Sequence, residues 1–98
     1  MSDDYQKLSD EQIKQELAKL NGWTVANGKL TRTLEFKDFN EAFGFMTRVA
    51  MEVEKLNHHP EWFNVYNRVK IELVTHDVNG ISNYDFKLAS IINRLAER

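Results

Sequence analysis

Apolar residues recur at helical spacing in three segments of the chain. The first segment begins at Ser9, which forms a capping-box pattern with Gln12, and we expect the helix to end near Asn21 and Gly22. Its apolar positions are Ile13, Leu17 and Leu20. The last segment begins with Ser82 and Asp85, another capping pattern. Its stripe consists of Tyr84, Leu88, Ile91, Ile92 and Leu95.

The middle segment predicts the longest helix. It begins at Asp38, which forms a capping pattern with Glu41, and lasts until the histidines at 58 and 59, where Pro60 disfavours helical geometry. Its apolar positions are Phe39, Ala42, Phe43, Met46, Val49, Ala50 and Val53. Phe45 and Leu56 widen this arc to roughly 160°, which suits either a broad core helix or a helix covered partly by another subunit.

The segments between these helices have the pattern of β-hairpins. Residues 23–26 and 29–36 flank Asn27 and Gly28, a pair that favours the positive φ angles of a tight hairpin turn. In the second strand the apolar positions Leu30, Leu34 and Phe36 share one face. Residues 63–67 and 69–76 predict a second hairpin, in which Val69, Ile71 and Leu73 share a face and His76 ends the strand. Residues 77–80 are expected to form a loop.

The predicted order is therefore α-β-β-α-β-β-α. Two hairpins favour a four-stranded antiparallel sheet with three helices on one face, an α+β architecture. Ninety-eight residues with 42% hydrophobic content predict one domain over residues 1–98.

Composition narrows the function classes. The net charge of −2 gives little electrostatic support for binding nucleic acid directly. The chain has no cysteine, so it offers neither disulfides nor thiolate metal ligands. No apolar run approaches the length of a membrane span, and the polar amino terminus does not have the pattern of a signal peptide. We expect a soluble cytoplasmic protein.

All three histidines lie within nineteen positions, at 58, 59 and 76. Imidazole both donates and accepts protons near neutral pH, so this cluster predicts an acid/base site. Two adjacent histidines before a proline, taken alone, are also typical of a solvated turn. Three imidazoles and a water can also hold zinc, but the spacing lacks the HExxH helical pattern. We expect no metal and no other cofactor.

The motif around the histidines resembles the pterin-4a-carbinolamine dehydratase family. ExxxHHPxW in residues 54–62 is followed by Thr75, His76 and Asp85, and residues 36–40, 42–50 and 60–67 are also similar to that family. The resemblance runs from about Gly22 to Ala89. It implies a four-stranded antiparallel sheet with three helices, assembled as dimers or tetramers.

The resemblance also implies an activity, the dehydration of a 4a-hydroxytetrahydropterin to the quinonoid dihydropterin. This step recycles the cofactor of aromatic amino acid hydroxylases. His58 and His76 match the family's acid and base positions, with the division of roles open, and His59 matches a position that orients the pterin. Asp85 would hold an imidazole in its productive tautomer, or it would serve only as the third residue of a capping box.

Other positions match residues that line the family's substrate pocket. Glu54 lies one turn before His58 and would support an imidazole, and Trp62 would offer either an apolar wall or core packing. The remaining matches are Asn57, Pro60, Val74 and Thr75. Two positions depart from the family's commoner pattern: Asn57, which is often acidic, and Tyr84, which is often basic.

The main alternative is an interaction role. Some animal members of this family stabilise the dimerisation helices of a homeodomain transcription factor, which implies a coactivator role and a nuclear location in addition. The apolar helix over 39–56 would then pack against a second copy of the chain or against partner helices. Phe45, Met51 and Phe86 lie off the principal stripes and are candidate contact residues, with ordinary exposed or peripheral packing as the alternative.

Overall fold

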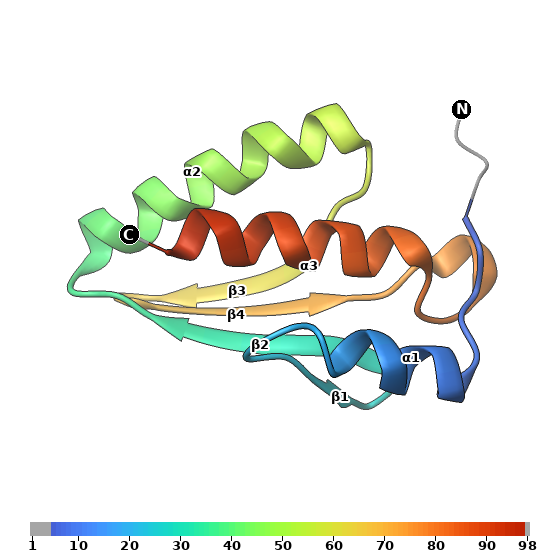
Figure 1. The fold of residues 1–98 in the computed structure, drawn as a ribbon. Helices are drawn as coiled ribbons and strands as arrows, with labels where there is room; N and C mark the ends of the chain where they lie inside the picture. The colour runs from blue at the N-terminus through green and yellow to red at the C-terminus, as the bar shows by residue number, and fades with distance from the viewer. Residues whose placement is uncertain (1–4, 98) are drawn as a thin grey trace.

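The structure, a computed structural model, describes residues 5–97. Its elements follow the predicted order (Figure 1): α1 (Asp10–Leu17), β1 (Thr24–Ala26), β2 (Lys29–Glu35), α2 (Phe39–Leu56), β3 (Glu61–Val65), β4 (Arg68–Leu73), the short 3₁₀ helix η1 (His76–Val78) and α3 (Asn83–Ala96). The four strands form one antiparallel sheet in the order β1-β2-β4-β3. This confirms the α+β fold with three helices. None of the described helices is long and apolar enough to cross a membrane.

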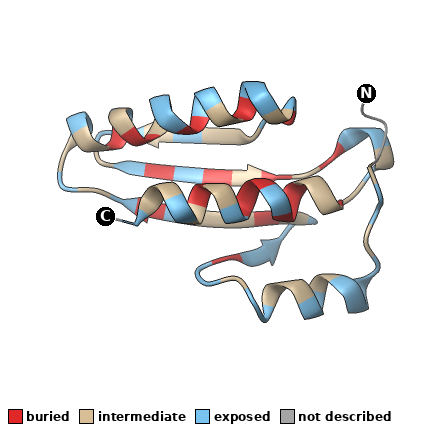
Figure 2. Ribbon diagram, turned by 45° about the horizontal axis from the view of Figure 1, so that its top comes forward, coloured by how far each residue is buried: buried red, intermediate tan, exposed pale blue. Residues whose placement is uncertain are grey.

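The core lies between the sheet and the helices α2 and α3. Figure 2 shows buried residues gathered on the central strands and on the inner sides of these two helices. On β4 the predicted apolar face is confirmed, because Val69, Ile71 and Leu73 are fully buried. Helix α1 contains no buried residue; its Ile13 and Leu17 pack against the edge of the core.

The starts of the helices were predicted correctly because each depends on local hydrogen bonds. Complete capping boxes form at Ser9 with Gln12 and at Ser82 with Asp85. Asp38 accepts a hydrogen bond from the Glu41 backbone N–H at the start of α2. Several predicted ends were wrong: α1 ends at Leu17 rather than near Gly22, because residues 18–20 continue as tighter i→i+3 turns.

The strand ends also differ from the prediction. In the second hairpin Tyr66 adopts a positive φ of 51° and begins the turn, so β3 covers residues 61–65 instead of 63–67. Strand β4 ends at Leu73, three residues before His76. The following Thr75 pairs with Gly80 in an isolated bridge, and His76 begins η1 rather than ending a strand.

Two predicted contact residues belong to the core. Phe45 is fully buried and Phe86 is 7% exposed, so both predictions of a partner contact were wrong. The reason is rotational: the buried face of α2 is centred on Ala42, Phe45, Val49 and Val53. Phe39 and Phe43, which the stripe assigned to the same face, are 46% and 54% exposed.

Candidate active site

A cavity of about 180 Å³ lies where the chain leaves α2 and β4. It is lined by Tyr5, Asn57, His58, His59, Val74, Thr75, His76 and Asp77. All three histidines of the chain therefore contribute to one cavity, although they come from two separate parts of the fold. Six of these eight residues were predicted as site residues from the sequence.

The end of α2 turns the two adjacent histidines in different directions. Asn57 terminates the helix in the left-handed conformation (φ 57°, ψ 43°), and its N–H donates to the Val53 carbonyl at 2.8 Å. After this turn His58 is buried, with 6% of its surface exposed. The side chain of His59 is 56% exposed. The cavity thus has one buried and one solvated imidazole from neighbouring positions.

His58 is paired with a buried carboxylate. Its Nε2 lies 2.6 Å from Oδ1 of Asp85, which is completely buried in the first turn of α3. An ionised carboxylate only accepts hydrogen bonds, so this contact requires the imidazole proton on Nε2. In the neutral ring the other nitrogen, Nδ1, then carries a lone pair that can accept a proton.

Neighbouring donors fix the orientation of the Asp85 carboxylate. Its Oδ2 accepts from the Thr75 hydroxyl and from the Ser82 backbone N–H, both at 2.8 Å. Because the Thr75 hydroxyl has a single hydrogen, the 2.7 Å contact between Thr75 and Ser82 places the Ser82 hydroxyl as the donor. No buried side-chain nitrogen or oxygen among residues 5–97 lacks a hydrogen-bond partner. The capping box of α3 and the support of His58 are one network.

The two exposed histidines also face carboxylates. Nε2 of His59 lies 2.9 Å from Glu54, and Nε2 of His76 lies 3.2 Å from Glu61. Glu61 also accepts a hydrogen bond from Lys29 at 2.6 Å. This hydrogen bond lowers the pKa of the Glu61 carboxyl, and the contact with His76 adds to the effect. The hydrogen bond between Lys29 and Glu61 also raises the pKa of Lys29.

Four predicted site residues do not line the cavity. Asp85 lies behind His58, and Glu54 reaches the site only through His59. Pro60 follows the histidine pair without lining the cavity, and Trp62 packs against the hydrophobic core. The predicted aromatic wall therefore does not come from Trp62 in this structure.

Sequence reasoning missed three residues at the site. Asp77 follows His76 directly, so its position in the chain was an available signal. Glu61 lies within the histidine motif and was passed over as a partner of His76. Tyr5 gave no signal, because only the tertiary fold brings the amino-terminal segment to the cavity.

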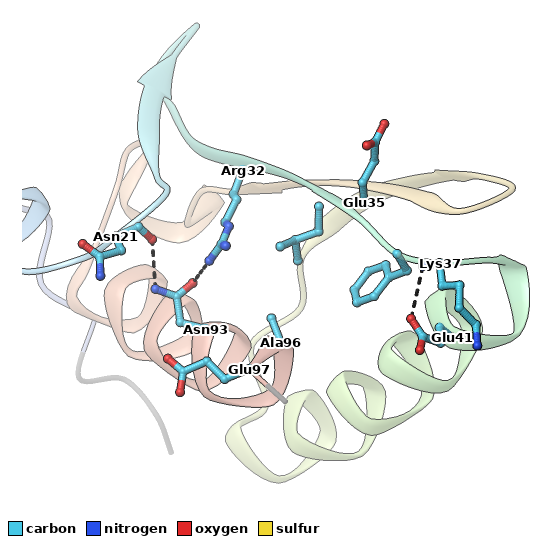
Figure 3. Close-up of a pocket in the computed structure, with 10 residues that line it drawn as sticks. Asn21, Arg32, Glu35, Lys37, Glu41, Asn93, Ala96 and Glu97 are labelled. Carbon is cyan, nitrogen blue, oxygen red and sulfur yellow. Dashed lines mark hydrogen bonds between the residues drawn. The ribbon is translucent and has the colours of Figure 1, made fainter.

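A larger cavity of about 480 Å³ lies among β2, α3 and the start of α2 (Figure 3). Arg32 extends into it from the inner side of the sheet and donates to Oδ1 of Asn93, which also accepts from the indole N–H of Trp23. Burial lowers the pKa of the Arg32 guanidinium, and Glu97 opposes part of that shift. This cavity is not lined by a histidine, and its Asn93 side chain is hydrogen-bonded to Asn21, Trp23 and Arg32. The histidine cavity is therefore the candidate active site.

Within residues 5–97, no group of three or more histidine, cysteine, aspartate or glutamate side chains is arranged to hold a metal ion. Each of the three histidines instead faces its own carboxylate.

Comparison with known proteins identifies the family. The profile of the family described as "Pterin 4 alpha carbinolamine dehydratase" matches residues 6–95. A provisionally named pterin-4-alpha-carbinolamine dehydratase from Burkholderia pseudomallei is 53% identical, over 93% of this chain and 92% of its own length. A protein of the same name from Prochlorococcus marinus is 58% identical, over 90% of this chain and 92% of its own length.

A solved structure agrees with these relatives. The crystal structure of a transcriptional coactivator/pterin dehydratase from Brucella melitensis superposes with a TM-score of 0.90 at 45% sequence identity, covering 94% of this chain and 100% of that one. The chain belongs to the pterin-4a-carbinolamine dehydratase family.

Proposed function

We propose that this protein dehydrates a 4a-hydroxytetrahydropterin to the quinonoid dihydropterin, the step that recycles the cofactor of aromatic amino acid hydroxylases. The observation that carries the proposal is the convergence of His58, His59 and His76 on one cavity. Family membership and the relatives named pterin-4-alpha-carbinolamine dehydratase support the same reaction.

The chemistry requires two proton transfers. The bond between C4a and its hydroxyl breaks, and the hydroxyl must receive a proton to leave as water. The neighbouring ring nitrogen loses its proton, so that its electron pair forms the new double bond to C4a. One proton is delivered and one is removed, so the reaction needs an acid and a base and no net oxidant.

His58 is the proposed base. Asp85 holds the proton of the neutral ring on Nε2, which leaves a lone pair on Nδ1. When Nδ1 takes a proton from the substrate, the buried carboxylate at 2.6 Å stabilises the imidazolium that forms. The same pairing logic operates in the histidine–aspartate pair of serine proteases.

His76 is the proposed acid, and His59 is proposed to orient the pterin. His76 lies 3.2 Å from Glu61, and its side chain is 78% exposed, so solvent can restore its proton after each turnover. His59 is solvated and held by Glu54 at the same cavity. Asn57, Val74 and Thr75 complete the proposed binding surface.

A stopped-flow assay with chemically generated 4a-hydroxytetrahydropterin tests the reaction. His58→Ala and His76→Ala should each reduce kcat by about 10² to 10⁴, the usual contribution of one positioned acid or base. Activity should survive exhaustive chelation. A native chain that does not accelerate dehydration above the spontaneous rate would refute the proposed function.

A second proposed role is association through α2. The Phe39 and Phe43 rings lie 5.5 Å apart and more than 45% exposed on this helix, and Met51 is 57% exposed. A solvent-facing apolar surface of this kind is typical of a protein interface. We propose that it is covered by a second copy of the chain in a homodimer or homotetramer. The neighbour described as a transcriptional coactivator suggests that helices of a transcription factor are an alternative occupant.

A further inference from the structure

The histidine cavity has an aromatic wall that comes from the amino-terminal segment. Tyr5 lines the cavity together with the three histidines. Its ring lies 5.8 Å from the His58 ring, tilted by 50°, and 4.9 Å from the ring of Tyr84 in an edge-on arrangement. Among the described residues that line the cavity, Tyr5 is the one aromatic side chain other than histidine, whereas Trp62 packs against the core.

The segment behind Tyr5 is anchored to the turn that carries the buried carboxylate network. The Gln6 N–H donates to the Asn83 side chain at 2.8 Å, and the Asn83 N–H donates to the Gln6 carbonyl at 3.2 Å. Lys7 pairs with Ser82 in an antiparallel bridge. Figure 1 shows the segment running beside the start of α3. The backbone that carries Tyr5 is therefore fixed relative to Ser82 and Asp85.

Two tyrosines, Tyr5 and Tyr84, pack near His58, and their positions relative to the cavity distinguish their roles. Asp85 holds one edge of the imidazole, and Tyr84 packs against it with ring centroids 5.9 Å apart. Tyr84 does not line the cavity, so we assign its ring contact to the support of His58. Tyr5 remains half-buried and keeps part of its surface in the cavity, where a bound molecule would meet it.

We propose that Tyr5 is a substrate-positioning residue: its ring forms the wall against which the flat bicyclic ring of the pterin packs while the histidines exchange protons with it. This inference rests on the proposed dehydratase function. Stacking of a heterocyclic base on an aromatic side chain typically changes affinity by about 5- to 150-fold. Residues 6–8 then hold Tyr5 in place relative to the His58–Asp85 pair, through their contacts with residues 81–83.

Three variants of the full chain test the proposal: Tyr5→Leu, Tyr5→Phe and Tyr84→Leu. Two measurements are made on each, the equilibrium dissociation constant of an unreactive 7,8-dihydropterin by fluorescence quenching, and KM and kcat for dehydration by stopped flow. Tyr5→Leu should weaken pterin binding and raise KM about tenfold, with a much smaller change in kcat. Tyr5→Phe retains the ring and should restore most of the affinity. Tyr84→Leu should lower kcat by loosening His58 and change pterin affinity less than twofold.

The outcomes separate this inference from the proposed function. If the native chain dehydrates the substrate but Tyr5→Leu binds the pterin as tightly as the native chain, the wall is refuted and the dehydratase stands. Equal loss of affinity in Tyr5→Leu and Tyr5→Phe would also refute it, because the ring face is present in the second variant. A native chain that neither binds the pterin nor accelerates dehydration overturns both. Thermal unfolding of each variant checks that it is folded.

Discussion

Asp85 shows at the scale of single residues how one side chain serves both the fold and the proposed chemistry. Its Oδ2 closes the capping box of α3, and its Oδ1 contacts His58. The structural and the functional interpretations of Asp85 are therefore compatible, since each uses a different oxygen. Because the donors on Oδ2 are fixed, the carboxylate cannot rotate to release the imidazole without losing them.

Asp85→Asn should change the tautomer of His58. If the amide oxygen keeps the hydrogen bonds from Thr75 and Ser82, the NH₂ group faces Nε2 and forces that nitrogen to accept, which moves the ring proton to Nδ1. We expect kcat to fall by up to about 10⁴, the loss seen for the corresponding change in a serine protease. Stopped-flow dehydration measures the loss, and ¹⁵N NMR of the imidazole reports the tautomer.

Asp10→Asn is the matched control, because Asp10 also lies in the first turn of a helix and is exposed. It should leave both the rate and the His58 spectrum unchanged. An Asp85→Asn variant that keeps the native tautomer and rate would contradict the proposed role of the carboxylate.

The ion pair of Lys29 and Glu61 predicts a pH dependence of stability. The pKa of Glu61 is lowered in the folded protein, so its contribution is present above the ordinary carboxyl pKa and is lost as pH falls through the folded value. The pKa of Lys29 is raised, so its contribution is lost only at alkaline pH, above the ordinary lysine value. Glu61→Gln should therefore be slightly less stable than the native chain near neutral pH.

Urea unfolding at several pH values measures this difference. It should vanish in acid and shrink in high salt, because the pair is partly exposed to solvent. A difference that stays constant down to pH 2 would show that Glu61 acts through packing instead of charge.

At the scale of elements, the termination of α2 sets the direction of both adjacent histidines. The left-handed conformation of Asn57 ends the helix one residue before His58. Asparagine tolerates this conformation better than other residues that carry a side chain, and glycine adopts it freely. The backbone of one residue thus decides that His58 is buried and His59 exposed.

Asn57→Ala and Asn57→Gly should separate the backbone effect from the loss of the side chain. Both variants remove the amide from the cavity, but alanine in the left-handed region costs about 1 kcal/mol relative to glycine. We expect Asn57→Ala to be less stable by about that amount in urea unfolding, with a larger loss of dehydration rate than Asn57→Gly. Equal stability of the two variants would mean that the helix end relaxes to another conformation.

At the scale of the whole molecule, α2 presents one apolar side to the sheet and another to solvent. Ala42, Phe45, Val49 and Val53 fill the core, while Phe39 and Phe43 lie outside it. The wide apolar arc is therefore divided between a core face and the proposed association surface. The angle of a phenylalanine around the axis of this helix decides whether it lies in the core or on the proposed association surface.

Phe43→Asp should reduce the oligomeric mass in light scattering and leave the fold intact, because a charge would enter the proposed interface. Phe45→Asp should instead unfold the chain, since a carboxylate in a fully buried site costs more than about 4 kcal/mol. Lys14→Ala changes the net charge by the same amount in exposed α1 and should not alter the mass. A native monomer, or an unchanged mass for Phe43→Asp, would contradict the proposed surface.

The sequence by itself determined the elements and their order. Local patterns among residues a few positions apart were enough to recognise them. These are the caps at Ser9, Asp38 and Ser82, the turn at Asn27 and Gly28, and the alternation in β4. Such local interactions are formed wherever the segment lies in the fold, so they could be recognised without it. The gathering of the histidines near one site could also be expected from their spacing and from the family motif.

Only the tertiary structure decided which side chains meet. Periodicity gives the width of an apolar arc but not its centre, so it could not distinguish Phe45 from Phe43. The contact of Asp85 with His58 joins residues 27 positions apart, and the contact of Tyr5 with the cavity joins still more distant segments. These contacts depend on how helices pack on the sheet, because packing sets the distances between elements that no local pattern encodes.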